Sequence, residues 1–267
     1  MLNLEDRVKY DMNKPVQPKI LFFDIETTPI KAYTWGPKWE TNLIEFLEYS
    51  QILSYSAKWY KGKQETKGQI DYKGYRPKKL DDSKIVKDIH NLFDEADIIV
   101  TQNGVSFDTK TMNARFIKSG LAPPSPYKNV DTKLEAKKYL RLPSYSLDDM
   151  GDYFGLGRKM HHTGFDLWKE CMNGNKKAWT TMKKYNAQDV LLLEKLYNKI
   201  KPYMKSHPNF GEFLEKSCCG GCGSNHLNAR GYARTSTAVY QRFQCMDCGS
   251  WGRTQAKERS FKINKRL

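Results

Sequence analysis

The sequence lacks any long apolar run. No stretch approaches the roughly 20 apolar residues that a membrane-spanning helix needs, so we expect no membrane attachment. The amino terminus also lacks a basic segment followed by an apolar one, so we expect no secretory signal and a location inside a cell. The chain contains no internal repeat. Its 267 residues, 39% of them hydrophobic, suffice for one mid-sized domain and a smaller one.

Acidic residues are scarce compared with basic ones. The chain has 30 aspartates and glutamates against 45 lysines and arginines, a formal net charge of +15 and a pI near 9.4. Such an excess favours polyanionic partners, of which nucleic acid is the first candidate. A soluble protein with many solvated lysines has the same composition, so the charge alone leaves both interpretations open.

The scarce carboxylates nevertheless follow a pattern, which begins in an apolar run from residue 19 to residue 26. This run predicts a buried strand, and Thr28-Pro29 ends it because the residue before a proline is held extended. Residues two apart on a strand share a face, so Asp24 and Glu26 are expected to project together. Because an Asp-x-Glu pair at a strand end is common by chance, the pair needs support from other segments.

Two later segments carry further members of the set. Asp108 closes the segment Asn103–Asp108, which follows a short β-branched run. Tyr185 and Asp189 are four apart in a long helical pattern, so they share one face of the helix. Four carboxylates in one cleft would repel each other unless cations lay between them, and oxygen-rich sites suit Mg²⁺ or Mn²⁺. Two such ions roughly 3.5–4 Å apart are the usual device for cleaving a phosphodiester.

With these residues the chain resembles a 3′–5′ exonuclease of the DEDD superfamily. The Tyr185-x-x-x-Asp189 spacing is that of the tyrosine subclass (DEDDy), since the histidine subclass would need a His where Lys184 stands. The segment Asn103–Asp108 is most similar to the proofreading domain of family B DNA polymerases, although Gln102 stands where that family often has Tyr. The resemblance covers about residues 18–206. We therefore expect a stand-alone relative of the proofreading domain, without a polymerase domain, of the type often found in phage genomes.

The resemblance implies an α/β fold and a role for each residue of the set. The fold would be RNase H-like, a mixed sheet flanked by helices. Asp24 would lie between two Mg²⁺ or Mn²⁺ ions, Glu26 and Asp189 would help to hold the ion that activates water, and Asp108 would support the second ion. Tyr185 would orient the attacking water. The candidate nucleic-acid contacts are Asn103, Phe107, Lys159, Arg230, Arg234, Arg242 and Trp251.

Other polar residues have weaker links to this set. In the family a basic residue near the position of Arg158 and Lys159 lies by the substrate, so one of these two residues is a candidate for that role. The alternative is that both are solvated charges of a loop. No spacing ties the adjacent His161 and His162 to the carboxylates, so we expect a surface or core role for them. Two further aspartates are not assigned to the set: we expect a structural role for Asp131 and a helix cap at Asp166.

Alternation and periodicity predict the elements around the set. Strands of one mixed sheet are expected at about residues 19–26, 30–35, 51–60, 69–75, 97–101 and 129–132. Helices are expected at about residues 84–96, 109–119, 133–140 and 176–200, and another begins near residue 145. Ser83 and Ser146 are the expected caps. The predicted organisation is an arm (1–17), an exonuclease domain (18–206), a linker (207–216), a zinc ribbon (217–253) and a basic tail (254–267).

Cysteine is also sparse, and four of the six cysteines form two Cys-x-x-Cys pairs with 22 residues between them. The pairs are Cys219 with Cys222 and Cys245 with Cys248. This spacing is typical of a zinc ribbon and predicts one structural Zn²⁺ with a β-hairpin between the pairs. A disulfide is disfavoured inside a cell. The neighbouring Cys218 could replace Cys219 as a ligand, but the two-residue spacing favours Cys219.

The cysteine region is basic. Residues 216–267 hold ten basic and two acidic side chains, a balance of +8. Aromatic residues interleave with the arginines, and rings that stack on bases beside cations that neutralise phosphates suit single strands. The alternative is that the rings fill the small core of the ribbon. The interleaved rings belong to Tyr232, Tyr240, Phe243 and Trp251.

Together these features predict a two-metal-dependent 3′–5′ exonuclease joined to a zinc ribbon, acting on single-stranded DNA in the cytoplasm, or in the host cytoplasm if phage-encoded. A 3′–5′ exoribonuclease is the enzymatic alternative, because nothing in the sequence reads a 2′-hydroxyl. A non-catalytic nucleic-acid-binding or inhibitory protein that uses the ribbon is the alternative of a different class. The ribbon also offers a surface for a protein partner.

Overall fold

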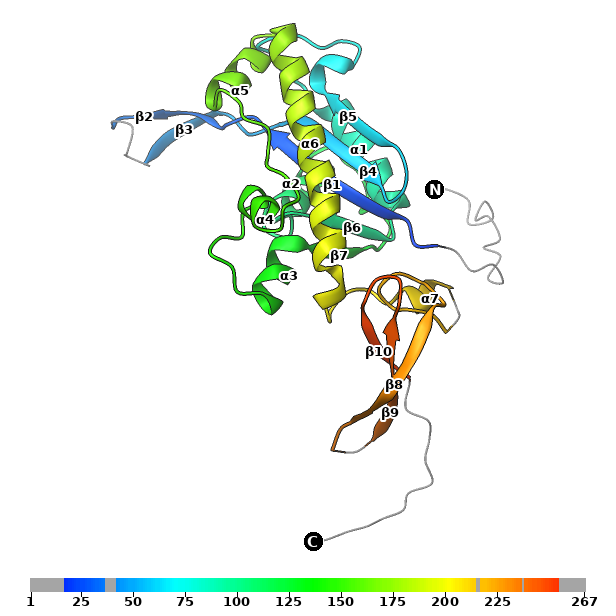
Figure 1. The fold of residues 1–267 in the computed structure, drawn as a ribbon. Coiled ribbons are helices and arrows are strands. Elements are labelled where there is room, and N and C mark those ends of the chain that lie inside the picture. Colours follow the sequence, from blue (N-terminus) through cyan, green and yellow to red (C-terminus); the bar gives the residue numbers. More distant parts are fainter. Residues whose placement is uncertain (1–16, 37–41, 215–216, 237, 255–267) are drawn as a thin grey trace, which may run out of the picture. The chain divides into compact units, whose positions relative to one another are not determined.

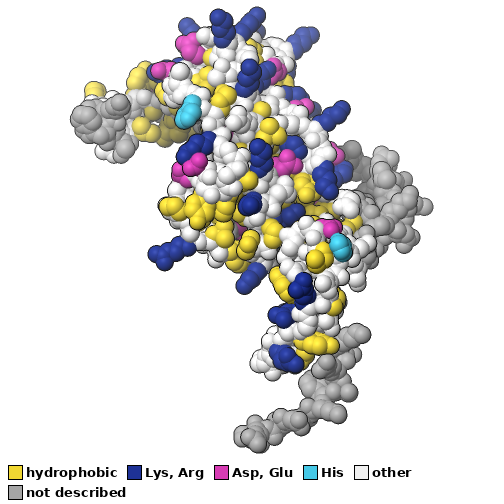
Figure 2. Space-filling view, in the orientation of Figure 1, with side chains coloured by type: hydrophobic (Ala, Val, Ile, Leu, Met, Phe, Trp, Pro, Cys, Tyr) yellow, Lys and Arg dark blue, Asp and Glu magenta, His cyan; other side chains and the backbone are white. Residues whose placement is uncertain are grey.

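The computed structural model describes residues 17–36, 42–214, 217–236 and 238–254. The described residues form two compact units, a large unit within residues 18–200 and a small unit that begins at residue 201 and is described up to residue 254. Among the described residues, none of the helices combines the length and apolar character needed to cross a membrane. Lys and Arg side chains are spread over the face seen in Figure 2, where Asp and Glu are sparser.

The large unit is built on a five-stranded mixed sheet with the strand order β5-β4-β1-β6-β7 (Figure 1). The central strand, β1 (Ile20–Thr27), pairs antiparallel with β4 (Ile52–Trp59) and parallel with β6 (Ile98–Thr101). The edges are β5 (Gln64–Gly68) and β7 (Lys128–Asp131). Helices flank the sheet, so the predicted mixed α/β architecture is confirmed.

Side chains of β1 alternate between two buried layers, because successive residues of a strand point to opposite faces. Leu21, Phe23 and Ile25 belong to the core formed with α1 (Ser83–Glu95) and α2 (Asp108–Lys118). Phe22 points the other way, and its ring meets that of Tyr197 edge to face at 5.3 Å. The face of β1 that carries Phe22 continues into Asp24 and Glu26, which are therefore directed towards the helix that carries Tyr197.

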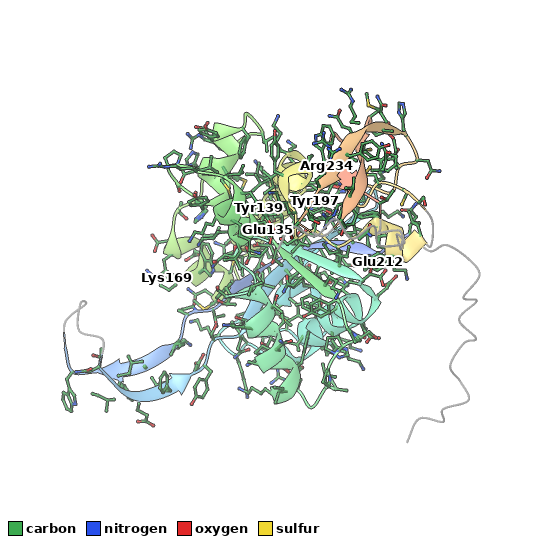
Figure 3. All side chains as sticks on the ribbon, turned by 90° about the horizontal axis from the view of Figure 1, so that it is seen from below. Glu135, Tyr139, Lys169, Tyr197, Glu212 and Arg234 are labelled. Atoms are coloured by element: carbon green, nitrogen blue, oxygen red, sulfur yellow. The ribbon has the colours of Figure 1, made fainter. Side chains whose placement is uncertain are left out.

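That helix is α6 (Lys176–Ile200), which contacts β1, β4 and β5. Its buried residues recur at helical spacing, and Tyr197 is fully buried (Figure 3). Figure 3 also labels Glu135 and Tyr139 of α3 (Thr132–Tyr139), a helix that packs against α6. The other helices that pack on α6 are α4 (Leu147–Tyr153) and α5 (Phe165–Met172).

A two-stranded hairpin of β2 (Lys31–Thr34) and β3 (Leu43–Glu48) forms a separate sheet in the large unit. The strand predicted at 30–35 therefore exists, but its place in the mixed sheet was wrong, and β3 was not predicted. Every residue of β3 is exposed, so burial did not shape its pattern. Hydrophobic side chains gather on the hairpin (Figure 2), and Trp35 is 91% exposed.

Three local predictions were wrong. Residues 69–75 do not form a strand: β5 ends at Gly68, and the short 3₁₀ helix η2 (Gln69–Asp71) follows because the Asp71 carboxylate accepts the Gly68 N–H at 2.9 Å. Ser83 is the first residue of α1 and Asp82 is its N-cap. Asp166 does not cap α5, whose N-cap is Gly164; it pairs with Lys169 at 3.0 Å within the helix. The cap at Ser146 is confirmed, since its side chain accepts the Asp149 N–H.

The small unit begins with the 3₁₀ helix η3 (Lys201–Tyr203) and the short helix α7 (Phe210–Leu214). A three-stranded antiparallel sheet follows, with the order β10-β9-β8. Its strands are β8 (Leu227–Arg234), β9 (Val239–Cys245) and β10 (Trp251–Arg253). β8 and β9 are the hairpin predicted between the two cysteine pairs. The predicted arm, up to residue 16, and the tail beyond residue 254 lie outside the described residues.

Candidate metal centre and its surroundings

Three carboxylates of the predicted set converge in the large unit. One oxygen each of Asp24, Glu26 and Asp189 lies within 4.8 Å of the others. The first two project from one face of β1, and Asp189 lies on α6, the helix that covers that face. The alternation of a buried strand and the periodicity of a buried helix thus bring together residues 163 or more positions apart in the chain.

The fourth carboxylate, Asp108, lies beside this group. It is the first residue of α2, it is 3% exposed, and its Oδ1 accepts the backbone N–H of Ile25 at 3.1 Å. That bond fixes the carboxylate against β1, next to Asp24. Asp108 is not among the three carboxylates that meet within 4.8 Å.

The four carboxylates disfavour each other's charge. Burial, and then the charges of Asp108, Glu26 and Asp189, raise the pKa of Asp24 well above its usual range. Burial is also the main cause that raises the pKa of Glu26 to about 8 and the pKa of Asp108 to about 7. A cluster with these pKa values is incompletely ionised at neutral pH, and a bound cation would lower them all.

Asp189 shows where such a cation would fit. Its Oδ2 pairs with the ammonium of Lys159 at 2.7 Å, whereas its buried Oδ1 has no hydrogen-bond partner among the described residues. A buried carboxylate oxygen without a partner is costly. Together with the neighbouring oxygens of Asp24 and Glu26 it forms an oxygen-only donor set of the kind that suits Mg²⁺ or Mn²⁺. The residues present therefore fit the divalent metal that the sequence predicts.

Tyr185 borders the carboxylates one helical turn before Asp189. Burial, and next the charge of Asp189, raise the pKa of the Tyr185 hydroxyl, which keeps it protonated. The ammonium of Lys159 lies 4.9 Å from the centre of the Tyr185 ring. Of the two basic residues considered from the sequence, Lys159 is thus the one at the carboxylates, while Arg158 pairs with Asp148 and Asp152.

His162 packs on the same tyrosine, which the sequence did not reveal. Its ring centre lies 4.7 Å from that of Tyr185 and 5.1 Å from that of Trp168, at steep angles. His162 is exposed, as the predicted surface role requires, but its ring contact with Tyr185 was not predicted. The histidine follows Lys159 closely in a loop, where no periodicity indicates which side chains face the site. His161 is exposed.

Asn186 is a second residue that sequence reasoning missed. It is fully buried, and its Nδ2 donates to Asp24 Oδ2 at 2.6 Å, while its Oδ1 accepts from Ser54 Oγ at 3.4 Å. The amide orients Asp24 within the group. A signal was available, because Asn186 stands three residues before Asp189 and therefore shares its face of the helix.

The loop between β6 and α2 carries Asn103 and Phe107, two of the candidate nucleic-acid contacts. Asp131 holds this loop, since its carboxylate accepts the backbone N–H groups of Asn103 at 3.0 Å and Val105 at 3.1 Å while it also caps α3. The structural role expected for Asp131 is borne out. Asn103 has a φ of +66°, and Phe107, next to Asp108, is 43% exposed.

The four predicted cysteines form a second candidate centre, in the small unit. Their sulfur atoms lie within 4.8 Å of one another, with Sγ–Sγ distances of 3.6 Å for Cys219 and Cys248 and 3.7 Å for Cys222 and Cys245. Tetrahedral Zn²⁺ with bonds of about 2.3 Å requires about 3.8 Å between sulfurs, so the four thiols fit zinc. Each pair is followed by a glycine with a φ of +76°, Gly223 and Gly249, where a side chain would be strained.

The remaining candidate contacts also lie in the small unit. Arg230 and Arg234 belong to β8, Arg242 to β9 and Trp251 to β10, and all four side chains are exposed. The guanidinium of Arg242 lies 5.6 Å from the centre of the Trp251 ring. The arginine and aromatic interleaving seen in the sequence is thus partly a surface feature, and not solely the filling of a core.

Comparison with known proteins addresses the fold of the large unit. A family model for the RNase H superfamily matches residues 21–201. A family B DNA polymerase from the hyperthermophilic archaeon Pyrobaculum calidifontis is similar in structure, with a TM-score of 0.51 and 16% sequence identity. The similarity covers 83% of this chain and 32% of the polymerase, so the chain corresponds to about a third of that protein. A comparison with curated proteins found no match.

Proposed function

Because the chain belongs to the RNase H superfamily, we propose that it is a metal-dependent 3′–5′ exonuclease whose preferred substrate is single-stranded DNA. The observation that carries the proposal is the convergence of Asp24, Glu26 and Asp189 within 4.8 Å. The polarity and the preference for DNA rest on the resemblance to the proofreading domain of family B polymerases. The similarity in fold to a family B DNA polymerase supports a nucleic-acid substrate.

The carboxylates Asp24, Glu26 and Asp189, with Asp108 beside them, would hold two divalent cations. When bound, such cations neutralise the carboxylates and stabilise the entering and leaving oxygens of an in-line displacement. The hydroxyl of Tyr185, kept protonated by its raised pKa, would orient the attacking water. Lys159 is half-buried beside the carboxylates and would meet a phosphate of the strand.

The position of each residue in the fold supports this division of roles. Asn186 and the Ile25 N–H orient Asp24 and Asp108 through hydrogen bonds of 2.6 and 3.1 Å, so these carboxylates are preorganised. Exposed Phe107 and the neighbouring Asn103 would contact the 3′ end of the strand. In the small unit, the four cysteines would hold one structural Zn²⁺, and we propose residues 217–253 as a zinc ribbon separate from an exonuclease domain of residues 18–206.

The proposal is tested with single-stranded DNA and RNA labelled at either end and incubated with Mg²⁺ or Mn²⁺. A 3′–5′ exonuclease releases a 3′ label at once as a mononucleotide and shortens a 5′-labelled strand stepwise. An identically purified Asp24→Asn variant gives the background from contaminating nuclease. Equal loss of both labels as internal fragments would contradict the exonuclease assignment. Faster decay of RNA would favour the exoribonuclease, and binding without decay would favour the non-catalytic alternative.

A further inference from the structure

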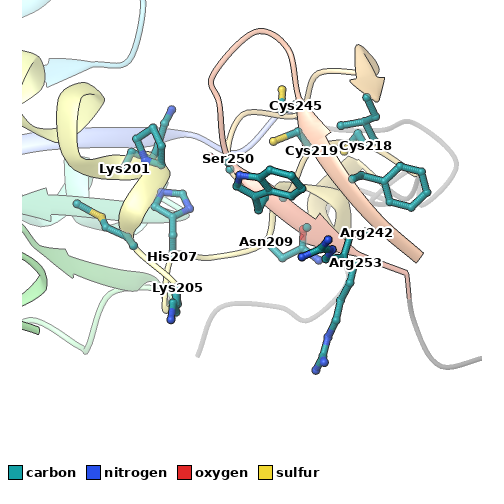
Figure 4. Close-up of a pocket in the computed structure, with 18 of the residues that line it drawn as sticks. Lys201, Lys205, His207, Asn209, Cys218, Cys219, Arg242, Cys245, Ser250 and Arg253 are labelled. Atoms are coloured by element: carbon teal, nitrogen blue, oxygen red, sulfur yellow. The ribbon is translucent and has the colours of Figure 1, made fainter. Parts of the chain in front are cut away.

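The small unit contains a cavity that borders Cys219 and Cys245 of the cysteine group and that the proposed hydrolysis does not use. Its volume is about 800 Å³, and it is lined by η3, by the segment that leads to α7, and by residues of β9 and β10 (Figure 4). Ligand sites commonly measure roughly 300–1,000 Å³. The cavity is therefore large enough for a nucleotide, and all of its lining residues belong to the small unit.

The lining is cationic. Lys201, Lys205, Arg242 and Arg253 contribute to it, and none of the described lining residues is an aspartate or glutamate. Lys201 is only 5% exposed, and its ammonium lies 5.9 Å from the centre of the Phe210 ring. The charge of the lining therefore selects for an anionic ligand.

Aromatic rings accompany these charges. Trp251 is 55% exposed although it lines the cavity, so its ring is available to a ligand. Trp251 and Arg253 are two apart on β10, and Arg253 pairs with Arg242 on β9, so all three side chains share one face of the sheet. This face thus presents two guanidinium groups beside an indole. Cations next to an exposed ring are the combination that binds phosphates and bases of single strands.

We infer that the cavity is a nucleoside-phosphate subsite, in which the arginines contact phosphate and Trp251 stacks on a base. The inference rests on the proposed function, because a single strand would be its natural source of nucleoside phosphate, and a free mononucleotide is the other source with the same chemistry. The cavity also divides the four candidate nucleic-acid contacts of the small unit into two pairs. Arg242 and Trp251 line the cavity, whereas Arg230 and Arg234 do not.

The test measures binding of a fluorescent oligothymidylate of about 15 nucleotides, within the range that one small binding module covers. The full-length Asp24→Asn protein is used, so that hydrolysis does not consume the probe. Trp251→Ala should weaken binding about 10-fold. Arg242→Ala with Arg253→Ala should reduce the slope of log K against log salt by about 1.4, because each phosphate contact on a single strand contributes about 0.7.

The matched control is Lys87→Ala with Lys118→Ala, which removes the same charge from exposed positions of the large unit. It should bind within about twofold of the parent protein, because neither residue lines the cavity and salt screens distant surface charges. Equal losses for both double variants would overturn the inference, since the effect would then be one of net charge. Retained zinc shows that each variant is folded, and Trp251→Phe should restore part of the affinity because it restores a ring.

Competition by thymidine 5′-monophosphate distinguishes the two sources of ligand. If the subsite binds a strand, thymidine 5′-monophosphate should displace the probe only at concentrations far above the dissociation constant of the oligonucleotide. If the subsite binds a free mononucleotide, displacement should occur at concentrations close to that dissociation constant. Hydrolysis of a labelled trinucleotide by protein with an intact Asp24 reports on the proposed function separately. If the trinucleotide is not hydrolysed but binding still depends on Trp251, the proposed exonuclease function is refuted and the subsite is supported. The reverse result would refute the subsite alone.

Discussion

Among single residues, Asp24 interacts with each of the other three carboxylates of the candidate centre. It accepts a hydrogen bond from Asn186, and burial, followed by the charges of three other carboxylates, raises its pKa. Asp24→Asn keeps the shape and an acceptor for Asn186 but removes the charge that a cation needs. We expect hydrolysis to fall by about 10³-fold or more, which corresponds to about 4 kcal/mol of transition-state stabilisation. Single-turnover assays with labelled DNA measure this, and an undiminished rate would exclude Asp24 from the centre.

Tyr185 is expected to act on water and not on metal. Tyr185→Phe keeps the ring against His162 and Trp168 and removes only the hydroxyl. The rate of hydrolysis should fall roughly 10²-fold, which is typical when a group that positions a proton or a water molecule is removed. The affinity for Mn²⁺ should stay nearly constant. Tyr153→Phe, an exposed tyrosine of the same unit, is the matched control. Substantial loss of Mn²⁺ binding by Tyr185→Phe in a calorimetric titration would show that the hydroxyl supports the metal instead.

The sequence located residues within one element better than contacts between elements. Asp24 with Glu26, and Tyr185 with Asp189, follow from the fixed geometry of a strand and a helix. The pairing of Lys159 with Asp189 does not, because Lys159 lies in an irregular segment that no periodicity places. His162 was missed for the same reason. Asn186 could have been found from its spacing, but a neutral amide has no chemical signature of a metal centre.

Among the elements, those with an extensive buried surface were predicted well. β1 is buried on both faces and α6 along one face, so their patterns carry a strong signal. The hairpin of β2 and β3 is exposed, and its apolar side chains do not alternate between a core and solvent. At the end of β5, the Asp71 carboxylate accepts the Gly68 N–H and the chain turns. β-Propensity alone does not predict such a local side-chain to backbone hydrogen bond.

The two Cys-x-x-Cys pairs of the small unit predict that the protein contains bound zinc. The protein should contain about one zinc per chain, because four thiolates at tetrahedral spacing form a closed structural site. Cys222→Ser with Cys248→Ser should lose the zinc and the cooperative unfolding of the small unit, since so small a module depends on its metal. Cys218→Ser, which alters a neighbouring cysteine outside the group of four, should keep both. Elemental analysis decides the matter, and full zinc in the double variant would contradict the assignment.

For the molecule as a whole, the carboxylate cluster predicts a pH dependence of stability. Glu26 has a pKa of about 8 in the folded protein, caused first by burial, against an ordinary value of 4.5. The folded state therefore binds this proton more tightly than the unfolded state. Without divalent metal, the free energy of unfolding should fall as the pH rises from 4.5 towards 8. Magnesium should reverse much of the loss by binding only to the folded centre.

Glu26→Gln isolates this effect from other titrating groups. Glutamine resembles the protonated side chain, so the variant and the parent should melt together near pH 4 without magnesium. Near pH 8 the variant should melt higher, by about 2–4 °C for each kcal/mol of relieved repulsion in a domain of this size. Thermal unfolding at both pH values measures the difference. A variant that melts lower than the parent at pH 8 without metal would show that Glu26 stabilises the metal-free fold, contrary to the expected repulsion.

The two units predict a division of labour between cutting and holding. All the carboxylates and Tyr185 lie in residues 18–200, whereas the subsite cavity and the cysteines lie beyond residue 200. Removal of residues 217–267 should therefore leave hydrolysis of a trinucleotide nearly unchanged. Long strands should be bound more weakly and degraded less processively, and the salt dependence of binding should flatten because phosphate contacts are lost. Fluorescence anisotropy at several salt concentrations and degradation ladders measure both effects. A truncated protein that binds and degrades long strands like the full chain would assign the small unit to another role, such as contact with a protein partner.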